Sequence, residues 1–164
     1  MKNIELETFI QNQSTELYSF AFILIPDDLQ ATQLMIDSVS AFMIQKRTLI
    51  DKWSAKDNSA LAHNAEDIKI HLYKSMFDLA KKRYHQVRMS FKSVEDNSGF
   101  FALDFDDKAV LYLKERTDFP LDVIEFILDQ TRTEIMAHLV SARMNLARSQ
   151  SQLKGFGNTV SNHN

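Results

Sequence analysis

The chain has 164 residues, of which 45% are hydrophobic and 25% are charged, and its net charge is −3. These values are typical of an ordinary globular protein with one domain or two small ones, and the acidic balance does not favour nucleic acid as a partner. With only three glycines, two prolines and no cysteine, the composition favours an all-helical chain and excludes disulfides and thiolate metal sites. No apolar run approaches the ~18 residues needed to span a bilayer, and no signal peptide is recognised, so we expect a soluble cytoplasmic protein without membrane insertion.

The first half of the chain is predicted to form three amphipathic helices. Pro26 ends the first helix, and Asp27 or Asp28 can cap the second. Residues 54–64 are polar and small, which predicts a loop. Glu66 then opens the third helix, where an acid suits the positive end of the helix dipole.

The later turns of this third helix are strongly basic. Residues 69–92 hold seven basic side chains against a single acid, Asp78: Lys69, Lys74, Lys81, Lys82, Arg83, Arg88 and Lys92. Such a helix could contact phosphate although the whole chain is acidic. A solvated face with cations that answer the helix dipole explains a lone basic cluster better.

The composition then divides the rest of the chain. Residues 93–100 are predicted to be a linker between a domain of residues 1–92 and a second domain of residues 101–152. Residues 153–164 contain glycine and polar side chains, which predicts a flexible tail.

Residues 108–148 are the most informative segment. Their apolar residues recur at spacings of three and four, which predicts helices that each bury one face. Pro120 suits a first helical turn, and residues 129–131 interrupt the pattern before Glu134 begins a longer helix. Two short helices around a tight turn, followed by a longer helix, is the arrangement of a DNA-reading helix-turn-helix module.

The other groups of polar side chains do not indicate a metal site or a catalytic site. The five histidines form no pair at helical spacing with an acid beside them, so no metal site and no cofactor are expected. Asp104, Asp106 and Asp107 precede an apolar helix, where a cap and dipole partners account for them. With no phosphate loop and no nucleophile motif, we expect no enzyme and no catalytic residue.

Several segments, taken in order, resemble conserved regions of bacterial sigma factors. Residues 17–24 with 27–28 and 31–34 resemble the opening of region two, and residues 72–74 with the basic run that follows resemble its later part. Residues 108–115, continued through 124–128 and 142–143, resemble region four. The chain therefore resembles the small extracytoplasmic-function class, which consists of these two domains only.

This resemblance implies an N-terminal helical bundle, similar to sigma region two, and a C-terminal helix-turn-helix domain, similar to region four. It implies core RNA polymerase and promoter DNA as partners, with an anti-sigma factor as a further one. The polymerase-binding residues would be Thr32, Gln33, Ile36 and Asp37. The DNA-binding residues would be Lys74, Lys81, Lys82, Arg83, Arg88, Arg132, Thr133, Met136, His138 and Arg143.

The chain departs from the family's pattern at positions that make contacts. Thr32 and Gln33 stand where the family has an acidic pair, Glu125 where it has a small alanine, and Asp129 where it has the turn glycine. The reader helix, residues 132–148, offers Met136, His138, Val140 and Ser141 in place of lysine and arginine, so fewer side chains can read base edges.

Two hypotheses follow. The leading one is a sigma-factor-like protein that initiates transcription by binding core RNA polymerase and promoter DNA. The alternative is a sigma-derived protein that has lost promoter reading and acts through protein–protein contacts or self-association.

Overall fold

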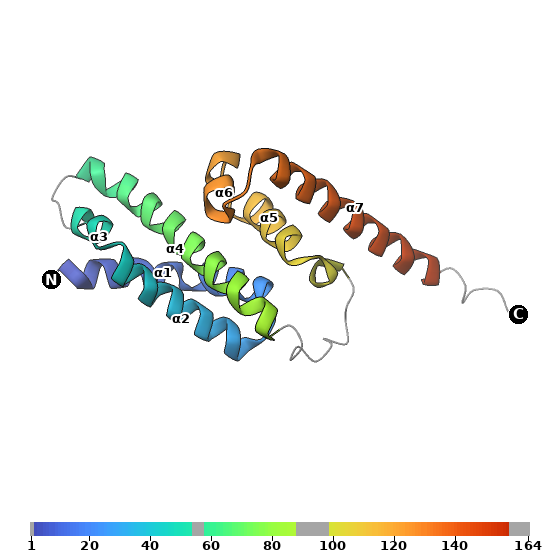
Figure 1. The fold of residues 1–164 in the computed structure, drawn as a ribbon, viewed down its shortest axis with the longest axis horizontal. Coiled ribbons are helices and arrows are strands. Elements are labelled where there is room, and N and C mark those ends of the chain that lie inside the picture. Colours follow the sequence, from blue (N-terminus) through green and yellow to red (C-terminus); the bar gives the residue numbers. More distant parts are fainter. Residues whose placement is uncertain (1, 54–57, 88–98, 158–164) are drawn as a thin grey trace, which may run out of the picture. The chain divides into compact units, whose positions relative to one another are not determined.

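The computed structural model describes residues 2–53, 58–87 and 99–157, and within these ranges the chain is helical and contains no strand (Figure 1). The prediction of an all-helical chain is confirmed. The chain divides into two compact units, residues 1–91 with 126–129 and residues 92–125 with 130–164. No described helix is long and apolar enough to cross a membrane.

The first unit is built on three long helices that pack against one another. Its helices are α1 (Lys2–Leu24), α2 (Asp28–Gln45), α3 (Arg47–Trp53) and α4 (Asn58–Val87). Helices α1, α2 and α4 contact one another pairwise, and α3 lies against α4. As predicted, α2 begins after Asp27, whose carboxylate accepts a hydrogen bond of 2.8 Å from the Gln30 backbone N–H.

The core of the first unit consists of apolar side chains at helical spacing. Phe20 on α1, Leu34 and Phe42 on α2, and Tyr73 on α4 are buried, and the rings of Phe20 and Tyr73 lie 5.0 Å apart between centroids. Each helix therefore buries one face, as the spacing of the apolar residues predicted.

The predicted loop over residues 54–64 is wrong for its second part. Helix α4 begins at Asn58, while residues 54–57 lie outside the described residues. The alanines at 60, 62 and 65 favour helix strongly, and their propensity outweighs the polar residues between them.

The second unit places two elements against its last helix. It contains the 3-10 helix η1 (Gly99–Ala102), the helices α5 (Phe105–Arg116) and α7 (Arg132–Gly157), and the first part of α6 (Leu121–Leu128), whose residues 126–128 belong to the first unit. Both η1 and α5 pack against α7. The buried residues Ile135, Leu139 and Ala142, spaced by four and three, form the packed face of α7.

A short turn separates α6 from α7. Asp129 takes a left-handed backbone conformation with φ 52°, a conformation that glycine adopts most readily. Thr131 and Glu134 then form a reciprocal cap: the Thr131 hydroxyl accepts from the Glu134 N–H at 3.3 Å, and the Glu134 carboxylate accepts from the Thr131 N–H at 2.7 Å. This cap fixes where α7 begins.

Helix α7 continues further than the sequence predicted. It extends to Gly157, so residues 153–157 are helical and are not part of a frayed tail. Residues 88–98 and 158–164, which include Arg88, most of the predicted linker and the rest of the predicted tail, lie outside the described residues.

The Asp129 turn leads to a first prediction. Asp129→Val should destabilise the protein by about 1–2 kcal/mol, because a β-branched side chain clashes in the left-handed region. Asp129→Gly should retain wild-type stability or exceed it, because glycine adopts this conformation without strain. Urea unfolding followed by circular dichroism measures both, and equal stabilities for the two variants would contradict the assigned conformation.

Candidate functional site

Helix α7 presents a stripe of apolar side chains to solvent. Met136, Val140 and Met144 are spaced by four residues and are 44%, 54% and 51% exposed. They lie on a face of α7 different from the one that packs Ile135, Leu139 and Ala142. We call these three residues the apolar stripe.

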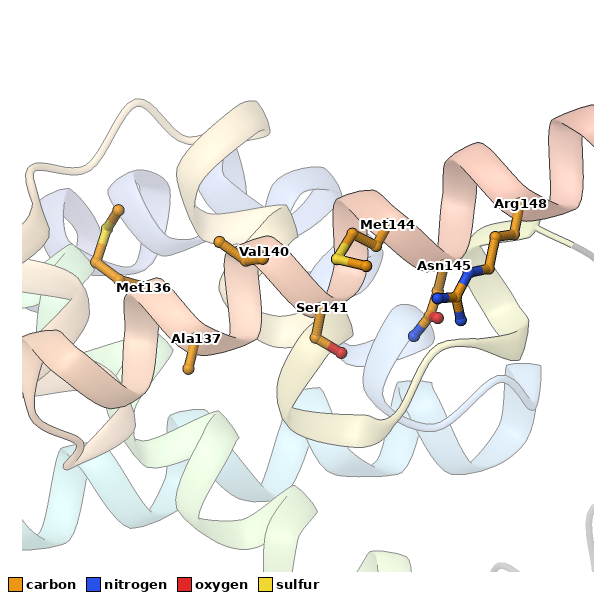
Figure 2. Close-up of a pocket in the computed structure, with 7 residues that line it drawn as sticks. All are labelled: Met136, Ala137, Val140, Ser141, Met144, Asn145 and Arg148. Atoms are coloured by element: carbon orange, nitrogen blue, oxygen red, sulfur yellow. The ribbon is translucent and has the colours of Figure 1, made fainter.

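The apolar stripe forms one wall of a shallow groove along α7. Figure 2 shows its side chains above a second row of smaller and polar ones on the same helix. The groove has a volume of about 610 Å³ and is lined by Met136, Ala137, Val140, Ser141, Met144, Asn145 and Arg148. From Met136 to Met144 the helix rises about 12 Å, so the surface is long and narrow.

A buried carboxylate determines which face of α7 is exposed. Asp107 on α5 is only 2% exposed, and both of its oxygens are bonded to α7. His138 Nδ1 lies 2.7 Å from Oδ1, and the Ser141 hydroxyl donates to Oδ2 at 2.8 Å. With these two polar residues held toward α5, the rotation of α7 about its axis is set and the apolar stripe points outward.

Sequence reasoning assigned Asp107 only to the helix cap and dipole. Asp104 does occupy the N-cap of α5, although its side chain makes no capping hydrogen bond. Asp107 in the first turn joins two helices instead, a contact between residues 31 positions apart. The paired spacing of His138 and Ser141, three residues apart on one helix, was the only local signal of this contact.

The predicted DNA-binding residues of the second unit do not form a free basic surface. Arg132 donates to Glu125 at 2.8 Å, and Arg143 donates to Glu115 at 2.7 Å. His138 faces Asp107 on α5. Thr133 and Met136 are exposed on α7.

Glu125 takes part in the same pairing. Its side chain is 28% exposed and reaches across the turn to Arg132. The position therefore holds a salt bridge between α6 and the start of α7.

The predicted DNA-binding residues on α4 are also engaged with neighbouring side chains. Lys74 lies 3.5 Å from Asp78, Arg83 pairs with Asp37, and Lys81 lies 5.5 Å from the centroid of the Phe77 ring. Lys82 is exposed. Exposed ion pairs are worth only about 0.2–1 kcal/mol, so a phosphate could displace these acids at small cost.

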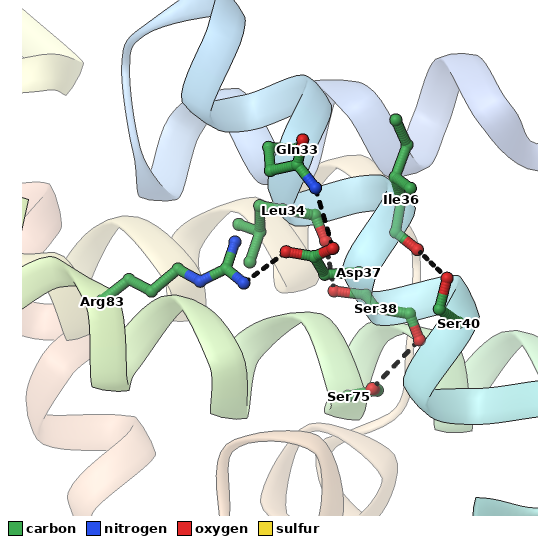
Figure 3. Close-up of polar contacts among 8 residues, drawn as sticks. All are labelled: Gln33, Leu34, Ile36, Asp37, Ser38, Ser40, Ser75 and Arg83. Atoms are coloured by element: carbon green, nitrogen blue, oxygen red, sulfur yellow. Dashed lines mark hydrogen bonds and ion pairs between the residues drawn. The ribbon is translucent and has the colours of Figure 1, made fainter. Parts of the chain in front are cut away.

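The predicted polymerase-binding residues lie on α2 and are largely tied to the helix bundle (Figure 3). Asp37 accepts hydrogen bonds from Gln33, at 2.8 Å, and from Arg83 on α4. The Thr32 hydroxyl donates to the Asp28 carbonyl at 2.7 Å. These contacts hold α2 against α4 and stabilise the helix, and they require no polymerase to explain them.

Ile36 differs from these three residues because its side chain is available. It is 50% exposed and lines a groove of about 280 Å³ between α1 and α2, together with Ile10, Leu17, Met35 and Val39. The first unit thus carries an apolar surface of its own at one predicted polymerase-binding position.

The arrangement offers no recognisable chemistry within the described ranges. Among those residues, no group of three His, Asp or Glu side chains could hold a metal ion. Comparison of the chain with models of known protein families, with curated proteins and with solved structures finds no match. The exposed apolar surfaces at Ile36 and along α7 are therefore the features from which a function can be inferred.

The Asp107 contact leads to a second prediction. Asp107→Ala should destabilise the second unit by about 1–3 kcal/mol, because it leaves His138 and Ser141 without their shared acceptor. Glu115→Ala on the same helix is the matched control, since its ion pair with Arg143 is exposed and worth less than about 1 kcal/mol. Urea unfolding measures both variants, and an equal loss in the two would show that Asp107 does not hold α7.

The Arg83 guanidinium and then the Gln33 amide lower the pKa of Asp37 by hydrogen bonding to its carboxylate. A carboxyl whose pKa is lower in the folded state stabilises the fold above its unfolded pKa, and this contribution disappears as the pH falls through the folded pKa. Asp37→Asn should therefore be less stable than wild type at pH 7 by about 0.2–1 kcal/mol.

This difference should shrink as the pH falls below about 4, where an unfolded aspartate takes up its proton, and it should vanish once the pH passes the lowered pKa of folded Asp37. Urea unfolding at pH 7 and pH 3 measures it, with Asp51→Asn in α3 as a control for removing an exposed acid from the same unit. A difference between Asp37→Asn and wild type that is the same at both pH values would contradict the pairing.

Proposed function

We propose that this chain is a sigma-like protein that acts through protein–protein contacts made by the apolar stripe of α7, without reading a promoter sequence. The observation that carries the proposal is the exposure of Met136, Val140 and Met144 on the helix that follows the helix-turn-helix turn. In DNA readers, side chains at this position contact base edges through hydrogen bonds. These three side chains have no N–H or O–H to donate, and exposed apolar residues in a row favour a protein surface.

The charge of the second unit supports the same proposal. Residues 99–157 contain nine Asp and Glu against seven Lys and Arg. Binding to the phosphate backbone depends on cationic contacts, each of which releases counterions and adds to the affinity. A unit with more acidic than basic side chains gains little from this effect.

A promoter-reading sigma factor is the second candidate. It is favoured by the geometry of the turn, in which Asp129 and the Thr131–Glu134 cap join an eight-residue helix to a longer one. For both candidate functions, core RNA polymerase is the partner to test first. Both candidate functions also place the protein in the cytoplasm.

Two variants separate these candidates. Arg132→Glu combined with Arg143→Glu reverses the cations of the reader helix, whereas Val140→Asp places a charge in the apolar stripe. We expect protein complexes to survive the charge reversals and to weaken about tenfold or more with Val140→Asp, because a buried carboxylate has no partner there. Pull-down of purified core RNA polymerase by the full chain measures this, and size-exclusion chromatography measures self-association.

A transcription assay tests the second candidate, promoter reading. Run-off transcription with core polymerase on genomic fragments should yield no defined products that depend on the added chain. Defined products that disappear with Arg132→Glu and Arg143→Glu would overturn the proposal and establish promoter reading. Leu153→Asp is the matched control on α7, because Leu153 is 64% exposed and lies outside the apolar stripe.

A further inference from the structure

We infer that the partner of the apolar stripe is a second copy of this chain, bound through an antiparallel pairing of the two α7 helices about Val140. This inference rests on the proposed function and names its partner. It is carried by the symmetry of the exposed residues on α7 and by the charges at the two ends of that surface.

The exposed side chains are arranged symmetrically about Val140. Met136 and Met144 lie four residues before and after it, and the small exposed residues Thr133 and Ala147 lie seven before and after it. Spacings of three and four keep all five residues on one side of a helix.

A two-fold axis through Val140 makes this face complementary to itself. In an antiparallel pair, Val140 meets Val140 of the other copy, and each Met136 lies level with the other copy's Met144. A two-fold interface uses the same patch on both subunits, so residue i contacts j and j contacts i. A bulky residue then meets a bulky one at the centre, and Thr133 meets Ala147 at each end.

The charges beyond the stripe favour the same direction. Glu134 is exposed near the start of α7, and Arg148 is exposed near the far end of the groove. The antiparallel arrangement brings the Glu134 of each copy to the same end and edge as the other copy's Arg148. A parallel arrangement would instead place glutamate beside glutamate and arginine beside arginine, which is unfavourable.

The size of this surface determines the strength that we expect. The contact extends over about 20 Å of helix from Thr133 to Ala147. One helix pair of this length buries less than the about 1,200 Å² that is usual for stable complexes, so the dimer should be weak, in the range of about 10–100 µM.

Sedimentation velocity of the full chain from about 5 to 300 µM tests the pairing over this range of dissociation constants. We expect the wild type to shift from monomer toward dimer, and Val140→Asp to remain monomeric, since two carboxylates would meet at the axis. Leu153→Asp should behave as the wild type. Circular dichroism confirms folding of each variant, which the exposure of Val140 permits.

Cysteine crosslinking tests the register in a chain that has no cysteine of its own. Val140→Cys should form an intermolecular disulfide on oxidation, and so should Met136→Cys combined with Met144→Cys. Met136→Cys alone should not, because the two copies of this position lie about 12 Å apart along the pair. A crosslink from Met136→Cys alone would overturn the antiparallel register.

A charge reversal supplies an independent check. Arg148→Glu should weaken the dimer, because it places two glutamates at each end of the pair, and Arg148→Lys should keep it. Glu134 stays unchanged in this test, because its carboxylate also forms the cap with Thr131. An Arg148→Glu dimer as strong as that of the wild type would remove the argument from charge and overturn the assigned direction.

The outcomes for this inference and for the proposed function remain distinct. A wild-type chain that is monomeric at every concentration overturns the second copy as partner. If Val140→Asp then still abolishes a complex with core polymerase, the proposed function stands with that partner. If variants of the apolar stripe change neither self-association nor the complex with core polymerase, both proposals fail.

Discussion

The exposed face of α7 depends on one buried carboxylate. Asp107 lies within the first turn of α5 and bonds both His138 and Ser141, so it fixes α7 in rotation as well as in position. The apolar contacts of Ile135, Leu139 and Ala142 are not directional, whereas the two hydrogen bonds to Asp107 are, so they add a directional constraint on the rotation of α7. The exposure of Met136, Val140 and Met144 therefore follows from a polar contact on another side of the same helix.

Two features of the second unit bear on whether it binds DNA or a protein: its exposed charges and its exposed apolar stripe. Arg132 and Arg143 lie beside glutamates, but such pairs are weak at an exposed site and would yield to a phosphate. Ion pairing alone is therefore a poor argument against DNA. The apolar stripe is a stronger one, because burying its side chains at a partner's surface contributes about 25 cal/mol per Å², whereas at a base edge they would find little beyond a thymine methyl group. On our proposal, the helix that would read DNA in a helix-turn-helix module presents an apolar surface instead.

Local sequence features predicted the elements of the fold well and the tertiary contacts poorly. Pro26, Asp27 and the residues before Glu134 marked the helix ends because capping and helix breaking act within a few residues. The sequence pattern did not reveal that α4 begins at Asn58, because the polar residues there obscure the helix propensity of the alanines. His138 was assigned to the DNA-facing side because helical spacing gives angles relative to neighbours and does not give the partner helix. Its acceptor lies 31 residues away, and no periodicity within α7 could reveal it.

The length of α7 has a consequence for its motions. At 26 residues the helix is about 39 Å long, while α5, which packs against it, has 12 residues and is about 18 Å long. The last turns, from Gln150 to Gly155, are exposed and hold their shape mainly by continuing a helix that is anchored further back. Such turns open and close locally without unfolding the rest, so their backbone amides should exchange hydrogen with solvent much faster than those near Leu139. The free energy of opening thus falls along α7 toward its C-terminal end, and a partner that covers those turns would slow their exchange.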